Sequence, residues 1–429
     1  MSAPQYVSTR GGGEPVPFRE ALLDGLAPDG GLYVPTDVPA LPASWRSATA
    51  LSDLGTRVLG EWLPDVDRLD ALVTDALSFP VPLVPLSGGG WDGVHVLELS
   101  HGPTLSFKDV GARTMARLMA DALDGEPVTI LAATSGDTGS AVASGFEGVE
   151  GVRVVLLYPK GQVSEVQERQ LIVARENVRA LAVEGTFDDC QRLVKQAFAE
   201  ARPESGRLSS ANSINIGRLL PQMLYYVWAA RALAVAGAEG APLFVVPSGN
   251  LGNLTAGTLA MRGGLDVAGF LAAHNANDGF PRFLEGGDAP AGDSVRTLSN
   301  AMDVGVPSNL ERLRSLFSDD DLRGLVRGEA VTDDETTASM RSVHEATGYL
   351  CDPHTAVGLE AAQRARQRGE ADGPVVVLST AHPAKFPEAV EAATGVVPEA
   401  PERLAALWDA PVSVETIPPT LDALRARLG

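Results

Sequence analysis

Apolar and polar positions follow two different periods along most of this chain. Short apolar runs bounded by Gly, Pro, Ser and Asp are typical of buried strands, and apolar residues spaced three or four positions apart are typical of helices. From about residue 91 onward, strand, turn and helix patterns follow one another repeatedly. This order predicts an α/β protein in which helices cover both faces of parallel sheets.

The pattern places each expected element on a defined range. Strands are expected at 94–99, 128–133, 152–158, 178–183, 243–246 and 374–379. Helices are expected at 140–146, 163–174, 187–201 and 219–235, with others beginning near Lys108 and at Leu254. Before residue 90 the elements are shorter: a strand at 6–11, a helix at 18–26, an apolar stub at 32–34, and helical spacing over 51–79 that Pro64 interrupts.

A chain of 429 residues is long for one hydrophobic core, so we expect more than one domain. The change of pattern suggests a small N-terminal unit at 1–90. Two open parallel-sheet α/β lobes would follow, the first at 91–213 and the second at 214–429.

Composition and charge narrow the classes of partner. Hydrophobic residues make up 45% and charged residues 21%, an ordinary globular balance. The net charge of −21 argues against a nucleic-acid partner, because phosphate backbones need clustered Lys and Arg. An anionic substrate would therefore need locally placed cations and helix N-termini.

Neither a membrane segment nor a disulfide framework is expected. The longest apolar stretch, 219–236, contains Pro221, Gln222 and Arg231, which interrupt a membrane span. The two cysteines, Cys190 and Cys351, form neither a disulfide framework nor a paired-cysteine metal site. We expect a soluble cytoplasmic protein without a metal ion.

Lys108 lies between a turn-rich run and the start of a helix. The positive end of a helix dipole disfavours a charged ammonium, and partial burial beside Phe107 acts in the same direction. Both effects would make the amine nucleophilic. A solvated surface lysine has the same local sequence, so Lys108 becomes a candidate only together with other parts of the chain.

Two glycine-containing turns follow expected strands, where the ligands of α/β sheets bind. In SGNLGN at 248–253, glycines allow main-chain N–H groups to approach a phosphate at the start of a helix. In TSGDTG at 134–139, hydroxyl and N–H groups suit a carboxylate or phosphate, and Asp137 suits a ring hydroxyl. Ordinary turns and helix caps have the same composition.

Two further segments are candidates for ligand contact. Thr380, at the end of the 374–379 strand, could offer a neutral hydroxyl to a heterocyclic nitrogen. His382 and Lys385 follow it, and for each of them a routine surface position is the favoured interpretation. The polar run at 212–218, NSINIGR, leads into a helix and suits an anion or a purely structural turn.

Taken together, these parts match the needs of pyridoxal 5′-phosphate (PLP). That cofactor requires a nucleophilic lysine for its aldehyde, N–H groups for its phosphate and a partner for its ring nitrogen. Lys108, the 248–253 turn and Thr380 supply one of each.

Ordered motifs over nearly the whole chain give it a family resemblance. The chain resembles the fold type II (β-family) PLP enzymes and, among them, the threonine synthase family. The motifs are YVSTRG, DGGLYVP, HGPTLSFKD, TSGDTG, NSINIGRLLPQ, PSGNLGN, DPHTA and STAHPAKF.

The resemblance implies a role for each candidate. Lys108 would hold the cofactor and then move protons, and Thr380 would face the pyridine nitrogen. Asp137 stands where related enzymes often carry Asn beside the cofactor's 3′ oxygen, and Ser135 and Thr138 would contact the anionic end of the substrate. The cofactor phosphate would be bound by Gly249, Asn250, Leu251, Gly252 and Asn253.

The implied reaction converts O-phospho-L-homoserine and water to L-threonine and phosphate. Candidate cations for this phosphorylated substrate are Arg113, Lys160, Arg218 and Lys385. Three alternatives remain open: a PLP-dependent phospho-lyase, a relative such as threonine dehydratase or cysteine synthase, and a non-catalytic small-molecule-binding protein. Oligomeric state is not readable from the sequence.

Overall fold

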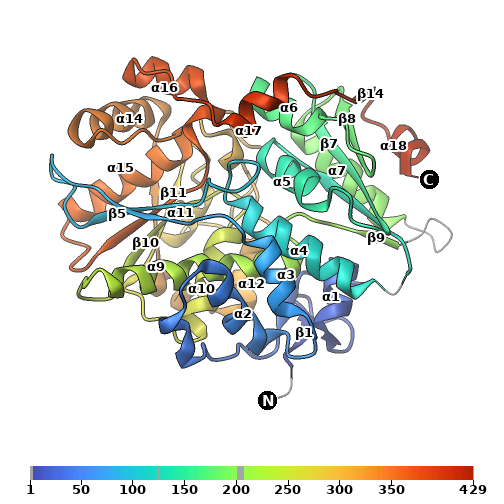
Figure 1. The fold of residues 1–429 in the computed structure, drawn as a ribbon, viewed down its shortest axis with the longest axis horizontal. Helices are drawn as coiled ribbons and strands as arrows, with labels where there is room; N and C mark the ends of the chain where they lie inside the picture. Colours follow the sequence, from blue (N-terminus) through green and yellow to red (C-terminus); the bar gives the residue numbers. More distant parts are fainter. Residues whose placement is uncertain (1–2, 124, 201–206, 429) are drawn as a thin grey trace.

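Two parallel sheets and one small antiparallel sheet organise the chain. The computed structural model describes residues 3–123, 125–200 and 207–428. Figure 1 shows the N-terminal elements packed below two α/β lobes that lie side by side. The expected fold class, an α/β protein with two open parallel sheets and a smaller N-terminal unit, is the one observed.

The larger sheet has six strands. Its strands are parallel except β4, which pairs with β5 in the antiparallel direction. In spatial order they are β12 (Val326–Ala330), β11 (Gly269–His274), β10 (Leu243–Pro247), β13 (Val375–Ser379), β5 (Val94–Glu98) and β4 (Leu83–Pro85).

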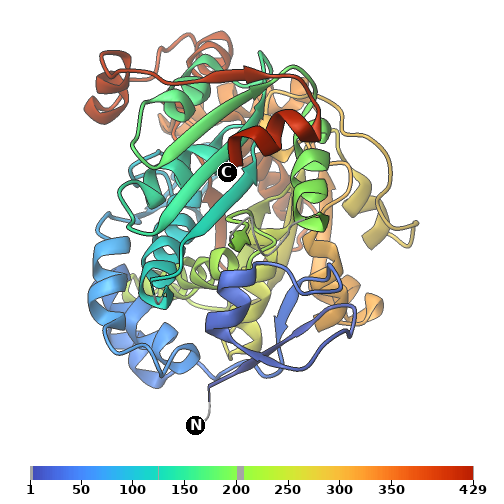
Figure 2. The same cartoon turned by 90° about the vertical axis from the view of Figure 1, so that its right-hand side faces the viewer.

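The second sheet has five parallel strands. In spatial order they are β14 (Glu415–Ile417), β8 (Val178–Val183), β7 (Val152–Pro159), β6 (Val128–Ala133) and β9 (Arg207–Ser209). Its edge strand β14 comes from the end of the chain, which passes from the larger lobe to the smaller one (Figures 1 and 2).

Helices surround both sheets. Those before residue 200 are α1 (Phe18–Asp24), α2 (Leu51–Trp62), α3 (Leu69–Ala76), α4 (Lys108–Ala122), α5 (Asp137–Phe146), α6 (Glu165–Ile172) and α7 (Phe187–Ala199). The later ones are α8 (Ile216–Leu219), α9 (Met223–Val235), α10 (Gly252–Arg262), α11 (Gly279–Leu284), α12 (Asn309–Leu316), α13 (Asp319–Leu325), α14 (Asp333–Thr347), α15 (Pro353–Gln367), α16 (Pro387–Thr394), α17 (Glu402–Ala405) and α18 (Leu421–Leu428). Short 3-10 helices are η1 (Ala43–Ser47), η3 (Leu220–Gln222), η4 (Asn300–Met302), η5 (Pro383–Lys385) and η6 (Ala406–Trp408).

Both faces of each sheet are buried, which explains the continuous apolar runs in the strands. In β10, Phe244 and Val246 face the large central core, whereas Leu243 and Val245 pack with α15 on the outer face. In the five-stranded sheet, Leu131 faces an outer core that α7 and α18 cover. The carboxyl ends of β6, β10 and β13 are thereby held at the boundary between the lobes.

The two large sheets do not follow the domain boundaries expected at residues 91 and 214, because two strands pair in the sheet of the other lobe. Strand β5 was expected in the first lobe, but it pairs with β13 in the six-stranded sheet. Strand β14 was expected in the second lobe, but it pairs with β8 in the five-stranded sheet. Strand order depends on pairing between residues far apart in the sequence, so apolar runs alone do not determine it. A division at residues 91 and 214 therefore does not match the sheets.

Several helices differ in detail from their expected ranges. The single helix expected at 219–235 is broken into α8, η3 and α9, because Pro221 supplies no N–H to the helical ladder. The last residue expected in α7, Ala201, lies outside the described residues. Among the described residues, none of the helices combines the length and the apolar character needed to span a bilayer. The cytoplasmic location stays a prediction.

The N-terminal unit contains a three-stranded antiparallel sheet that packs against the larger lobe. Its strands, in spatial order, are β2 (Val16–Pro17), β1 (Gln5–Ser8) and β3 (Tyr33–Pro35). The buried Arg312 of α12 donates from Nε to the Tyr33 carbonyl oxygen at 3.0 Å. Thr9 and Arg10 both donate to the carboxylate of Glu311 on the same helix. The unit is therefore fixed to α12.

Candidate functional site

The turns that follow several sheet strands line one pocket between the lobes. Its non-atom space is about 970 Å³, with the open solvent at its mouth included. Of the residues predicted from sequence, the pocket lining contains Lys108, Ser135, Asp137, Thr138, Arg218, Gly249, Asn250, Leu251, Gly252, Asn253 and Thr380. Segments separated by more than 270 positions are thus brought to one place.

Lys108 is the first residue of α4 and projects into this pocket. Its Nζ lies 5.2 Å from the centre of the Phe107 ring. Burial lowers the pKa of Lys108 to about 8, with Asp137 opposing the shift and Lys385 and Arg218 adding to it. An amine with this pKa is roughly one-fifth neutral near physiological pH, far more than an ordinary lysine, and can act as a nucleophile.

The turn before Lys108 is held by the neighbouring strand end. Phe107 donates its backbone N–H to the Thr380 carbonyl oxygen at 2.9 Å, and His382 donates to the Leu105 carbonyl oxygen at 3.0 Å. Leu105 is fully buried and has a positive φ of 61°. A non-glycine residue in this region is strained and needs surrounding contacts to hold it there. The pairing with residues 380–382 provides them, and it places Thr380 beside Lys108.

The turn after β10 has the geometry of an anion cradle. Leu251 adopts the left-handed conformation (φ 60°, ψ 8°) immediately before α10, and residues 249–253 line the pocket at the N-terminus of that helix, a position that favours an anion. A Cβ on Gly249 would lie 2.9 Å from Met302 Cα, and one on Gly252 would lie 2.9 Å from Ser213 Cβ. Both glycines are therefore required for this close packing.

Asn253 gives this cradle a further donor. Its Oδ1 accepts hydrogen bonds from the hydroxyls of Tyr225 at 2.6 Å and Tyr226 at 2.7 Å. Its Nδ2 is buried and has no partner among the described residues. A buried amide donor without a partner costs free energy unless a ligand accepts its hydrogen bond. The residues present therefore fit a bound phosphate.

A second layer of side chains holds the cradle. Asn309 Nδ2 donates to the Asn250 carbonyl oxygen at 3.0 Å and to Ser213 Oγ at 3.2 Å. Arg312 donates to Asn309 Oδ1 and to the carbonyl oxygens of Ser213 and Ile214. Burial lowers the pKa of Arg312 to about 9. The polar turn at 212–218 and the turn after β10 are therefore fixed to each other.

The turn after β6 starts α5 beside the pocket. Thr134 Oγ1 accepts from the backbone N–H groups of Gly136 at 2.9 Å and Gly139 at 2.8 Å. Gly136 has a φ of 135°, and a Cβ there would lie within 2.5 Å of the Gln167 side chain. This closed turn leaves Ser135 and Thr138 facing the pocket at the N-terminus of α5.

Asp137 is ionised although it is buried. Burial favours its neutral form, but the positive charges of Lys385 and Lys108 outweigh this and hold the pKa of the carboxyl well below its usual range. Lys385 Nζ lies 2.7 Å from Asp137 Oδ1. Lys385 is itself fully buried and is absent from the pocket lining, so it faces Asp137 instead of the pocket.

Of the four cations considered for the substrate, Arg218 lines the pocket. It is 1% exposed, and its Nε has no hydrogen-bond partner among the described residues. Its Nη1 donates to the Ala211 carbonyl oxygen. Burial lowers the pKa of Arg218 to about 10, which leaves the group charged at neutral pH.

The structure places two of the other cations elsewhere. Arg113 donates to the carbonyl oxygens of Ala76 and Asp75 at 2.8 Å, which fixes α4 to the region of α3. Lys160 is 53% exposed and pairs with Glu184 at 3.5 Å. Neither is among the residues that line the pocket, so neither is proposed as a substrate ligand.

His354 is a pocket residue that the sequence analysis did not select. It follows Asp352, whose carboxylate accepts from the His354 ring Nδ1 at 2.6 Å. The ring Nε2 accepts from the Ala301 backbone N–H at 3.1 Å, so the proton is assigned to Nδ1. The DPHTA motif contained both residues, but sequence alone gave no sign that they face the pocket.

Three family models match the chain. They are described as threonine synthase N terminus (residues 5–77), pyridoxal-phosphate dependent enzyme (residues 77–381) and threonine synthase, C-terminal (residues 355–427). Curated threonine synthases from Serratia marcescens and Escherichia coli are each 42% identical to it, with 96% of both chains covered.

The chain is also similar to solved structures of threonine synthases. Threonine synthase from Escherichia coli superposes with a TM-score of 0.90 at 40% identity, and PLP-bound threonine synthase from Brucella melitensis with 0.89 at 37% identity. Each match covers 99% of both chains. A fungal L-serine ammonia-lyase, at 15% identity and a TM-score of 0.55, shares the fold alone. The resemblance, the fold type II class and the PLP cofactor expected from the sequence are confirmed.

Lys108 should react as a low-pKa amine in cofactor-free protein. Because burial disfavours its charged form, its acetylation rate should rise with pH around a midpoint near 8, as peptide mass spectrometry can measure. The exposed Lys160 serves as the control for reagent activity at each pH. A Lys108 midpoint at or above the ordinary lysine value of about 10.4 would contradict the described environment of Lys108.

Proposed function

Because the chain belongs to the threonine synthase family, we propose that its pocket converts O-phospho-L-homoserine and water to L-threonine and phosphate. The enzyme is a PLP-dependent lyase. The observation that carries the proposal is the presence, in one pocket, of a nucleophilic lysine, an anion cradle and a separate buried arginine. Two phosphate groups, one on the cofactor and one on the substrate, need two such binding positions.

The cofactor would be held at both ends. The Lys108 amine would bind its aldehyde, and the N–H groups of residues 249–253 with Asn253 Nδ2 would bind its phosphate. Thr380 would offer a neutral hydroxyl to the ring nitrogen, and Asp137 would lie on the side of the 3′ oxygen. When bound, PLP supplies an electron sink joined to the substrate's amine.

The substrate's two anionic groups would take different positions. The hydroxyls of Ser135 and Thr138, with the N-terminus of α5, suit its carboxylate. Arg218 suits its phosphate, because its Nε lacks a partner and a charged guanidinium binds phosphate strongly. Lys385 is buried behind Asp137 and is left without a substrate contact.

Lys108 would be the group that moves protons during the reaction. With its Nζ free, it would take a proton from the α carbon, pass it on, and then take a proton from the β carbon as phosphate leaves from the γ carbon. One proton would return to the γ carbon, which becomes the methyl group, and a second would return to the α carbon. Water would supply hydroxide to the β carbon and its remaining proton to the released phosphate. A lysine pKa near 8 suits both directions of transfer, since neither protonation state is strongly disfavoured at neutral pH.

Replacement of Asn253 by Asp should weaken cofactor binding through the phosphate alone. The variant keeps the oxygen that accepts from Tyr225 and Tyr226 but replaces the unpaired donor with a negative oxygen. Loss of a charged hydrogen bond costs about 1.5–3 kcal/mol, or roughly 10–100-fold in affinity. The measurement compares binding of PLP and of pyridoxal, which lacks the phosphate, to cofactor-free protein. Equal losses for both ligands would contradict the assignment.

The product mixture and the role of Arg218 test the substrate proposal. With O-phospho-L-homoserine, we expect equal amounts of phosphate and threonine. Arg218→Met should raise KM by roughly 10–100-fold, because one charged hydrogen bond to the substrate phosphate is lost. The KM of Arg218→Lys, which keeps a positive charge, should lie between the values of the wild type and Arg218→Met.

Arg113→Met is the matched control for this prediction. It removes a guanidinium from the same region, but one whose hydrogen bonds go to Ala76 and Asp75 outside the pocket, so KM should change little. Phosphate with a keto acid in place of threonine would contradict the synthase reaction. An unchanged KM in Arg218→Met would contradict the role of Arg218 alone.

A further inference from the structure

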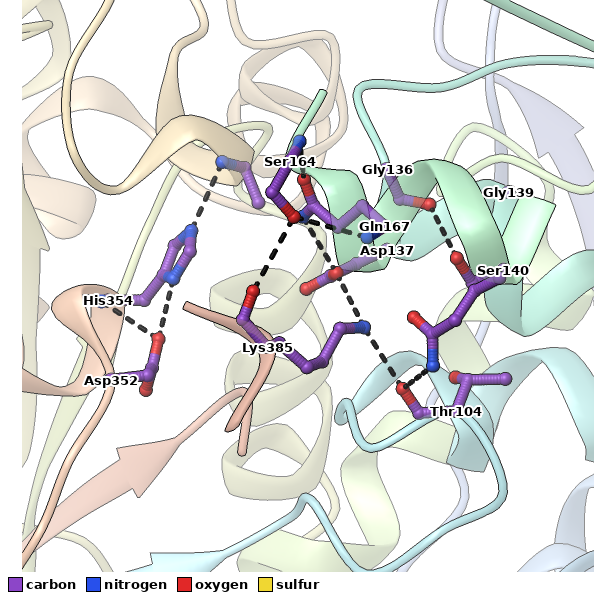
Figure 3. Close-up of polar contacts among 12 residues, drawn as sticks. Thr104, Gly136, Asp137, Gly139, Ser140, Ser164, Gln167, Asp352, His354 and Lys385 are labelled. Atoms are coloured by element: carbon purple, nitrogen blue, oxygen red, sulfur yellow. Dashed lines mark hydrogen bonds and ion pairs between the residues drawn. The ribbon is translucent and has the colours of Figure 1, made fainter. Parts of the chain in front are cut away.

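An ion pair closed off from solvent lies directly behind the pocket wall. Asp137 is 3% exposed and Lys385 is 0% exposed, and their charged atoms are 2.7 Å apart. Figure 3 shows that they come from different parts of the chain: Asp137 begins α5, and Lys385 ends the short helix η5. No step described above uses Lys385, yet a fully buried ammonium is costly to retain without a purpose.

The hydrogen bonds of the Lys385 and Asp137 side chains go to other buried groups of the protein. Lys385 Nζ also donates to the Thr104 carbonyl oxygen at 3.0 Å, and Gln167 Nε2 donates to Asp137 Oδ1 at 3.0 Å. Gln170 Nε2 donates to the same Thr104 carbonyl oxygen at 3.1 Å. The second carboxylate oxygen, Oδ2, has no hydrogen bond with the described residues (Figure 3). One oxygen is therefore fixed by the protein, and the other remains available to the pocket that Asp137 lines.

The pair sets the electrostatics around Lys108. The charged groups that act on Lys108 are Asp137 on α5, Lys385 on η5 and Arg218 on α8, and Asp137 supplies the opposite sign. A carboxylate favours the positive form of a neighbouring nitrogen, and a buried ammonium disfavours it. Lys385 does not line the pocket, so it acts on a ligand through Asp137.

We propose that Lys385 is a positioning residue that keeps Asp137 as an ionised, oriented carboxylate beside the Lys108 nitrogen. Asp137 then provides a fixed negative charge to the nitrogen that carries the cofactor and to the cofactor's 3′ oxygen side of the pocket. Thr104 and Gln167 complete the positioning by fixing each partner of the pair. The inference rests on the proposed function, because it takes Lys108 as the lysine that holds the cofactor.

The test measures Lys108 in single and double variants. In cofactor-free protein, Asp137→Asn should shift the pH midpoint of Lys108 acetylation down by about 1 unit, because the favourable negative charge is lost. Lys385→Met should shift it up by a similar amount, because a like charge is lost and Lys108 becomes the remaining counter-ion of Asp137. The Lys108 midpoint of the double variant should lie between the midpoints of the two single variants.

Thermal stability provides a second readout that does not require activity. Each single variant leaves a buried charge without its partner, so its melting temperature should fall by at least about 5 °C. The double variant, with a neutral pair, should recover most of this loss. The melting temperature of Lys385→Arg should fall less than that of Lys385→Met. Lys160→Met, which removes a surface lysine paired with Glu184, is the control and should leave both measurements unchanged.

The outcomes separate this inference from the proposed function. Opposite midpoint shifts in the two single variants support the positioning role of Lys385. Lower melting temperatures with unchanged Lys108 midpoints would overturn it, because the pair would then be structural only. If Lys385→Met is too unstable to measure, Lys385→Gln, which keeps a hydrogen-bond donor but loses the charge, takes its place. A Lys108 midpoint equal to that of the wild type in this variant would then overturn the inference. A wild-type protein that binds PLP without involving Lys108 would overturn the proposed function instead.

Discussion

The charged side chains buried around the Lys108 amine set the strictest demand on this fold. The protein carries a net charge of −21, yet three positive side chains lie together at the pocket. The charges of Lys385 and Arg218 act on Lys108 and lower its pKa. Buried ions are tolerated only with partners and good geometry. Asp137 is the carboxylate that faces two of them, and it comes from a different sheet turn from either lysine. The lobes must therefore keep a fixed separation for the pocket to exist.

The N-terminal unit contributes to that separation from outside the pocket. It supplies no residue of the described lining, but Tyr33 accepts a hydrogen bond from the buried Arg312. The same guanidinium binds the 212–214 turn and, through Asn309, the turn at Asn250. One side chain thus joins the N-terminal sheet to both turns that would bind phosphate groups. This arrangement gives a physical reason for the family's N-terminal segment to accompany the catalytic fold.

Sequence patterns predicted the local elements well and the spatial arrangement less well. Strands such as β6 and β8 have the expected bounds because an apolar run between turn residues is a local property. The assignment of β5 to the six-stranded sheet depends on pairing with residues almost 300 positions later. Pocket residues at strand ends were predictable, since parallel sheets bind ligands there. The directions of Arg113 and Lys385, and the pocket position of His354, were not, because tertiary packing decides which way a side chain points.

In the proposed function, the Lys108 nitrogen carries the cofactor and residues 249–253 bind its phosphate. Reduction of the PLP-bound enzyme with borohydride, followed by peptide mass mapping, locates the attachment directly. We expect one pyridoxyl-phosphate group per chain, on the peptide that contains Lys108. A modified Lys385, or any other modified lysine with Lys108 unmodified, would contradict it.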